Sequence, residues 1–199
     1  MDLDLIIMLQ LLKTMIRKTD RIIGLFLIRL SPIIRPGFAT IIAIHFYKRW
    51  GMRFIGKPNY LSAKINFDGT DYSLIEIHEG STISSYVRVL THDWSLYTVA
   101  KAFDHFAEPP IGKIKGISIG AYSFIGTGTI IMPGARIGRG CIIGSGTVVR
   151  GNIPDFSIVV GSPGKIIGDT RQHVKKQFER LKIALPNPLK PTLEKSYRG

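Results

Sequence analysis

The chain has 199 residues, room for one domain with attachments, and 45% of them are hydrophobic, enough for a packed core. Its single cysteine, Cys141, excludes an intramolecular disulfide and fits a reducing compartment. The first residues lack the pattern of a secretory signal peptide, so we expect a cytoplasmic protein.

The net charge of +13 is concentrated at the two ends of the chain. Residues 1–60 carry ten basic and three acidic side chains, residues 61–164 carry eight of each, and residues 165–199 carry nine and three. A partner attracted by charge should therefore meet the ends. No recognised nucleic-acid motif is present, and the basic residues flank apolar runs, so we expect no nucleic-acid partner.

Residues 1–50 are predicted to be helical, within a basic amphipathic region 1–60. Apolar residues recur at three- and four-residue steps through 5–16, together with Lys13, Arg17 and Lys18. The longest charge-free run of the following apolar stretch covers 36–47, short of the roughly 20 residues that cross a bilayer. Two interpretations stay open: helices that pack on the main domain or on a neighbouring subunit, or a patch that lies on an anionic membrane surface.

A six-residue repeat dominates residues 61–168. Aliphatic residues mark the register at Ile119, Ile125, Ile131, Ile137, Ile143 and Val149, and upstream at Ile65, Ile77, Ile83 and Val89. Small residues follow four positions later at Ser123, Thr129, Ala135, Cys141 and Thr147. Three short strands spaced by six residues wind one triangular coil, with aliphatic residues inward and small residues at the corners. The period therefore predicts a left-handed parallel β-helix, an exception to the right-handed crossover rule.

A loop at 91–116 interrupts the repeat and crowds polar, ionisable and aromatic residues together. Long loops on a regular scaffold are commonly functional. After the repeat, Asp169 or Thr170 is expected to cap a helix over 171–183, within a C-terminal region 169–199 that ends in a proline-containing tail.

Five segments carry a recognisable pattern: Thr-His-Asp at 91–93, then 117–126, 130–138, 149–154 and 159–167. Together they resemble the hexapeptide-repeat acetyltransferases, which include galactoside, maltose, serine and xenobiotic acetyltransferases. The layout is most similar to O-acetyltransferases of bacterial surface-polysaccharide pathways, over about 65–168. The sequence departs from the family pattern at Gly164, where alanine is usual, at Gly151, often lysine, and at Phe124, commonly tryptophan.

The resemblance implies a homotrimer whose active sites lie between two subunits, with acetyl-CoA as donor lying along the coils. By position, Gly126 and Thr127 bind the cofactor, and the backbone N–H of Thr127 approaches the thioester carbonyl. Ser145 contacts the pantetheine arm. Arg150 and Lys165 are placed to meet the cofactor phosphates.

The resemblance places the catalytic histidine at His92, where the loop begins. An alcohol is a poor nucleophile at neutral pH, so a general base must take its proton, and histidine has an unperturbed pKa of about 6.5. Asp93 orients the imidazole, contacts the acceptor or is a solvated loop carboxylate, and Trp94 either stacks on a sugar or packs the loop. His105 is a weaker candidate base. No metal is required.

The expected reaction is acetyl transfer to a hydroxyl of a sugar acceptor in surface-polysaccharide biosynthesis. Alternatives are a small acceptor such as an amino acid, free sugar or xenobiotic, or a non-enzymatic β-helix interaction module. Zinc carbonic anhydrase activity on the same fold needs three histidine ligands across facing coils, and no histidine lies between 111 and 167.

Overall fold

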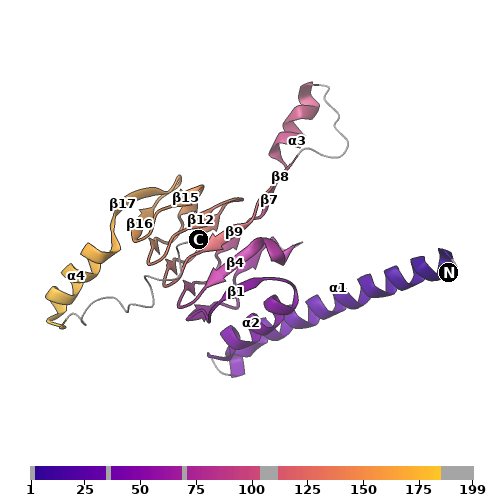
Figure 1. Ribbon diagram of the computed structural model, residues 1–199, viewed down its shortest axis with the longest axis horizontal. Helices are drawn as coiled ribbons and strands as arrows, with labels where there is room; N and C mark the ends of the chain where they lie inside the picture. The colour runs from indigo at the N-terminus through magenta and orange to yellow at the C-terminus, as the bar shows by residue number, and fades with distance from the viewer. Residues whose placement is uncertain (1–2, 35–36, 69–70, 104–111, 185–199) are drawn as a thin grey trace.

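The computed structural model describes residues 3–34, 37–68, 71–103 and 112–184. Three parallel sheets form the faces of a left-handed β-helix, which confirms the predicted fold class. Helix α1 (Leu3–Ile34) extends from one end of this body, the arm that carries α3 (Ser95–Ala100) stands out beside it, and α4 (Thr170–Leu181) lies at the opposite end (Figure 1).

The faces are built from strands of two to five residues that recur in chain order. Face A contains β1 (Arg53–Ile55), β4 (Ile75–His78), β9 (Ile117–Ile119), β12 (Arg136–Ile137) and β15 (Asn152–Ile153). Face B contains β2 (Tyr60–Leu61), β5 (Thr82–Ile83), β10 (Phe124–Ile125), β13 (Ile142–Ile143), β16 (Ser157–Val160) and the antiparallel β17 (Lys165–Asp169). Face C contains β3 (Asn66–Phe67), β6 (Arg88–Val89), β11 (Ile130–Ile131) and β14 (Val148–Val149). Each coil passes from A to B to C, and we name the turns between them the A–B, B–C and C–A corners.

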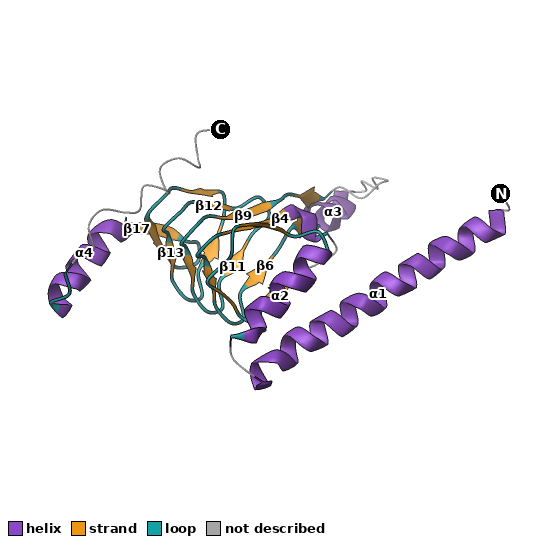
Figure 2. Cartoon of the chain, turned by 60° about the horizontal axis from the view of Figure 1, so that its bottom comes forward, coloured by secondary structure: helices purple, strands orange, loops and turns teal. Residues whose placement is uncertain are grey.

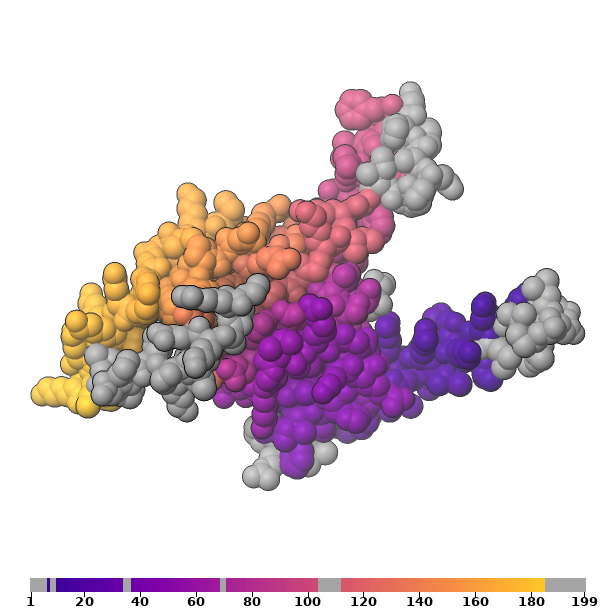
Figure 3. Space-filling model, in the orientation of Figure 1, coloured from indigo at the N-terminus to yellow at the C-terminus, as the bar shows by residue number. Residues whose placement is uncertain are grey.

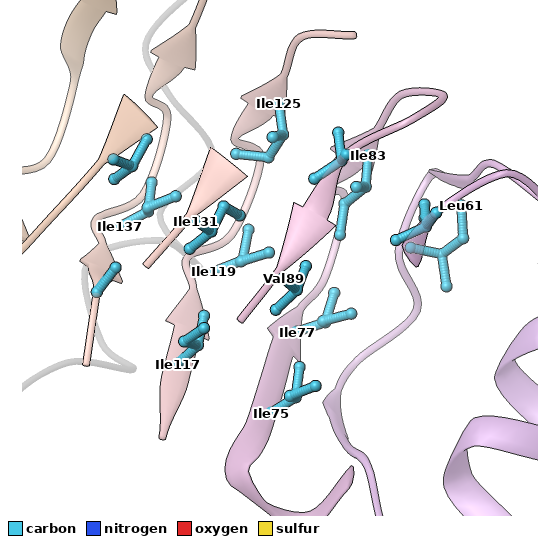
Figure 4. Close-up of a cluster of buried hydrophobic side chains, with 14 of the residues drawn as sticks. Leu61, Ile75, Ile77, Ile83, Val89, Ile117, Ile119, Ile125, Ile131 and Ile137 are labelled. Carbon is cyan, nitrogen blue, oxygen red and sulfur yellow. The ribbon is translucent and has the colours of Figure 1, made fainter. Parts of the chain in front are cut away.

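The core is a set of aliphatic columns, one behind each face (Figure 4). Ile125 pairs with Ile83 on one side and Ile143 on the other, and all three side chains are fully buried. Burial of each such side chain contributes about 1.5–3 kcal/mol. The small residues sit at the corners as predicted; Cys141 is fully buried there, and burial raises the pKa of its thiol.

The register of the first coil differs from the predicted one. Val89 pairs with Phe67 and not with Ile65, although Ile65 is also buried. The cause is a 3₁₀ turn at Tyr72–Leu74, which lengthens this coil beyond the regular repeat. A strict six-residue count therefore loses the register upstream of β4.

Two antiparallel helices cover the N-terminal end of the β-helix (Figure 2). Ile28 of α1 packs with Ala43 and Tyr47 of α2 (Phe38–Arg49) in the main core. About two turns before Ile28 in α1, the Asp20 carboxylate accepts a hydrogen bond from the Trp50 indole at 2.8 Å and forms an ion pair with Arg49. The C-terminal half of α1 is thereby fixed to the body.

Helix α1 continues through Pro32, which has no N–H to bond the carbonyl four residues earlier. That carbonyl belongs to Ile28, and the Ser31 hydroxyl donates to it at 2.7 Å. The bond lost to proline is therefore replaced from the neighbouring side chain. None of the described helices is long and apolar enough to cross a bilayer.

The C-terminal helix begins as predicted. Asp169 caps α4 by accepting the N–H of Arg171 at 2.8 Å, and the Arg171 side chain lowers the pKa of this carboxyl to about 2. The tail at 185–199 lies outside the described residues.

Candidate active site

The loop at 91–116 is an insertion at one C–A corner. Ile119 pairs with Ile77, 42 positions earlier, whereas Ile137 pairs with Ile119, only 18 positions earlier. The additional residues leave the coil as β7 (His92–Asp93), which pairs antiparallel with β8 (Lys113–Ile114), and continue into α3. Figure 3 shows this arm standing out from the body. The coils on either side still join, so the insertion does not break the β-helix.

His92 lies at the base of this arm, and its imidazole is held by a carboxylate that the sequence analysis missed. Nδ1 of His92 is 3.0 Å from Oδ2 of Asp68, whose side chain is 10% exposed. The same carboxylate accepts the backbone N–H of Thr91 at 2.5 Å, its hydroxyl at 2.8 Å and the N–H of His92 at 3.3 Å. Asp68 is thus fixed from several directions.

The pair defines which nitrogen of His92 is free to react. A carboxylate at Nδ1 favours the tautomer with its proton on that nitrogen, which leaves Nε2 as the basic atom. The His92 side chain is 33% exposed. One carboxylate therefore orients the ring while the ring itself stays accessible, as a general base requires.

The two residues after His92 have local contacts within the arm. Asp93 accepts the N–H of Ser95 at 2.9 Å, and this hydrogen bond, with the charges of Lys113 and Arg150, lowers the pKa of Asp93. The alternative in which Asp93 orients the imidazole is thus replaced by Asp68. Trp94 packs against Gly112, and its ring centroid is 6.2 Å from that of His92.

The residues expected to bind the cofactor lie mostly at the B–C corner. Gly126 and Gly144 touch the adjoining coils so closely that a Cβ would collide, whereas Gly128 and Gly146 have nothing within 4 Å of a Cβ position. Within the described part of the chain, the backbone N–H groups of Thr127 and Ser145 have no hydrogen-bond partner. The corner therefore presents an open column with free donors.

The remaining predicted residues lie apart from this column. Arg150 is at a C–A corner, on the side of the loop, because its charge acts on Asp93. Lys165 begins β17 and pairs with Val160 beyond the last coil. His92 and Thr127 stand at opposite edges of face C, so one subunit does not bring them together. His105 lies outside the described residues.

A further histidine, His78, belongs to a polar cluster on face A. Its Nε2 is 2.8 Å from Glu76, which also pairs with Arg53 at 2.5 Å. Burial raises the pKa of Glu76, but the hydrogen bond and charge of His78 and the charge of Arg53 outweigh it, so the pKa is lowered. This cluster lies on a different face from the His92 pair. Among the described residues no group of histidine, cysteine and carboxylate side chains is arranged to hold a metal ion.

The fold and the His92 pair define a β-helix protein with a histidine–carboxylate site at an inserted loop. Residues 116–151 match the family model "Bacterial transferase hexapeptide (six repeats)". The putative acetyltransferase YvoF of Bacillus subtilis is 30% identical over 63% of this chain and 67% of its own length. The chain belongs to the hexapeptide-repeat acetyltransferase family.

Other relatives are matched over a smaller share of their length. A probable acetyltransferase of Mycobacterium tuberculosis is 37% identical over 49% of this chain and 40% of its own length. The putative lipopolysaccharide biosynthesis O-acetyl transferase WbbJ of Escherichia coli is 29% identical over 53% of this chain and 55% of its own. Among solved structures, a galactoside acetyltransferase in complex with coenzyme A shares the fold, with a TM-score of 0.55 and 17% identity over 79% of this chain and 84% of that one.

Proposed function

We propose that this protein transfers the acetyl group of acetyl-CoA to a hydroxyl of a sugar acceptor, with His92 as general base. The observation that carries the proposal is the 3.0 Å contact between His92 and Asp68 at the base of the inserted loop. Membership of the acetyltransferase family supports the reaction class. The similarity to WbbJ, named for lipopolysaccharide biosynthesis, supports a sugar acceptor.

The proposed chemistry assigns one task to each group. Nε2 of His92 takes the proton of the acceptor hydroxyl while the hydroxyl oxygen forms a bond to the thioester carbonyl carbon. The free N–H of Thr127 stabilises the negative charge that develops on the carbonyl oxygen. The carbon–sulfur bond then breaks, and His92 returns its proton to the departing thiolate. Asp68 holds the imidazole throughout.

The open B–C corner supports the placement of the donor. Gly126, Thr127 and Ser145 lie along one column beside Gly128 and Gly146, where a Cβ would have nothing within 4 Å, which leaves room for an extended pantetheine chain. Arg150 and Lys165 lie apart from this column within one subunit, and the family resemblance assigns them the positive charge that meets the phosphates. Donor binding therefore needs backbone groups and cations only, with no metal.

A homotrimer completes the site in this proposal. His92 and Thr127 lie at opposite edges of face C, so His92 of one subunit must meet the B–C corner of another. Closed cyclic assemblies with such heterologous contacts repeat the same site at each interface. The separation within one chain supports a site that two chains share.

We further propose that α1 attaches the protein to the cytoplasmic face of the membrane. Apolar side chains on this helix stand in solvent, among them Met15 at 65%, Phe26 at 61% and Ile33 at 80% exposure. Lys13, Arg17 and Lys18 accompany them and are exposed. A basic amphipathic helix of this kind lies in the interface of an anionic bilayer.

Self-association of α1 is less favourable on charge grounds. A bundle of three copies would bring these cations together, because the helix contains only two acidic residues, Asp4 and Asp20. Asp20 is already engaged by Arg49 and Trp50. Anionic lipid, by contrast, supplies the missing negative charge.

The reaction is tested with the His92→Ala variant. We expect its acetyl-transfer rate to fall about 10²–10⁴-fold while acetyl-CoA binding stays near that of the wild type. Transfer is measured against a panel of oligosaccharides, with the product located by NMR, and donor binding by calorimetry. Wild-type turnover in the variant would remove His92 from this role.

A further inference from the structure

A recess of about 1000 Å³ opens beside the proposed donor column, between the end of α1 and the first coils. Ser62, Ser85, Asn66 and Gly128 contribute to its wall. Gly128 directly follows Thr127, whose N–H is proposed to hold the thioester carbonyl, and its own N–H bonds the carbonyl of Ser85 at 3.1 Å. The recess thus begins where the acetyl group would be presented.

The lining of the recess is positively charged. Arg29 comes from α1, Lys64 from the first B–C corner and Arg88 from β6, and all three are exposed. Among the residues that the structure describes, no acidic side chain lines the recess. Within the described chain, neither Arg29 nor Arg88 forms an ion pair, and the Lys64 ammonium contacts the Tyr86 hydroxyl, at 3.3 Å, and the Tyr86 ring. Three uncompensated cations that converge on one cavity favour an anionic ligand.

Two tyrosines complete the recess. Tyr60 and Tyr86 are 40% and 59% exposed there. Tyr86 has a φ of 62°, the left-handed conformation that glycine occupies at the corresponding positions Gly128 and Gly146 of later coils. A side chain there costs about 1–2 kcal/mol. An exposed aromatic face suits stacking on a sugar or a base.

We infer that this recess binds the acceptor and that the acceptor carries a phosphate group, as a glycosyl phosphate or diphosphate. This inference rests on the proposed acetyl transfer. Arg29, Lys64 and Arg88 hold the phosphate, the tyrosines contact the sugar, and the hydroxyl points to the thioester beyond Gly128. A neutral oligosaccharide would leave the three cations unpaired.

Two sources share this chemistry, a nucleotide-linked sugar and a polyprenyl-diphosphate-linked sugar. Arg29 belongs to α1, whose apolar side chains we place at the membrane, so a lipid-linked sugar could present its phosphate to Arg29 there. A nucleotide-linked sugar would reach the same position from solution. The assay therefore includes both: UDP-N-acetylglucosamine in solution, and polyprenyl-diphosphate-linked N-acetylglucosamine in detergent micelles.

The test compares the full-length wild type with the Arg29→Gln/Lys64→Gln/Arg88→Gln variant. Inorganic pyrophosphate is titrated into protein saturated with coenzyme A, so that the donor groove is already filled. We expect the variant to bind pyrophosphate at least tenfold more weakly, to raise KM for the phosphorylated acceptor, and to bind acetyl-CoA as the wild type does. Arg136→Gln, on face A, is the matched control and should change none of these values.

The outcomes separate this inference from the reaction itself. Transfer to one phosphorylated acceptor and not to free N-acetylglucosamine supports the inference and identifies the source. Equal KM values for free and phosphorylated sugars, or unchanged pyrophosphate binding in the triple variant, would overturn it while acetyl transfer stands. Absence of acetyl-CoA binding in the wild type would instead refute the proposed function.

Discussion

One side of the His92 imidazole contacts the Asp68 carboxylate, and the side chain is partly exposed to solvent. The carboxylate meets Nδ1 of His92 and two backbone N–H groups at the loop base. Its position 24 residues before His92 explains why sequence analysis missed it. The contact depends on the length of the first coil, and the 3₁₀ turn at Tyr72–Leu74 alters that length. His92 itself was selected through the resemblance to the family, which places its histidine at the junction between repeat and loop, and its role stays a prediction.

At this scale, Asp68→Asn should lower kcat about 10–10³-fold with little change in KM for acetyl-CoA. The amide keeps the shape of the side chain but removes the charge that holds the imidazole in its reactive tautomer. Steady-state kinetics with both substrates measure the split. Asp155→Asn is the matched control, because Asp155 also accepts a backbone N–H of another coil, that of Arg139 at 2.9 Å. An equal loss in both variants would indicate general destabilisation.

The six-residue repeat is the part of the fold that the sequence predicts best. A period of six fixes which side chains face inward, and Ile119, Ile125 and Ile131 are all fully buried. The long unbroken α1 was less predictable, because Pro32 reads as an interruption and the hydroxyl of Ser31 compensates for it. The lining of the recess also escaped prediction, because Arg29 meets Lys64 and Arg88 only after α1 folds back on the coils.

Some glycines lie so close to the backbone of the next coil that adding a side chain there should lower the free energy of unfolding. A Cβ at Gly120 would lie 2.5 Å from the backbone of Gly138, which cannot move without disturbing the next coil. Gly120→Ala should therefore lower the free energy of unfolding by about 3 kcal/mol. Denaturant unfolding at fixed protein concentration measures the change. Gly168→Ala is the control, because its Cβ would be 3.6 Å from the Ile158 side chain, and it should change stability by less than about 0.5 kcal/mol.

At the scale of the whole molecule, sites shared between subunits predict recovery of activity on mixing. His92→Ala lacks the base, and Ser145→Trp blocks the exposed donor column. Each homotrimer should be inactive. Random 1:1 reassembly gives about three-quarters mixed trimers, each with one intact site of three, hence about a quarter of wild-type activity. Co-refolding followed by transfer assays measures this, and no recovery would place the whole site within one chain.

The basic amphipathic helix α1 predicts salt-sensitive binding to anionic vesicles. Lys13→Glu/Arg17→Glu/Lys18→Glu should abolish sedimentation with phosphatidylglycerol vesicles, since each cation near the surface is worth about 1 kcal/mol. The control carries the same charge change on α4, Lys175→Glu/Lys176→Glu/Arg180→Glu, and should still sediment. Equal binding of all three proteins, or of the wild type to neutral phosphatidylcholine, would contradict attachment through α1.

The inserted loop stands apart from the paired coils that keep the protein folded. Because β4 pairs with β9 across the insertion, the coils close whether the arm is long or short. Substitutions in the arm beyond His92 disturb neither the aliphatic columns nor the ladder of glycines. The described part of the arm can therefore change in sequence at little risk to folding. A scaffold of this design can vary one loop while the coils that carry it stay the same.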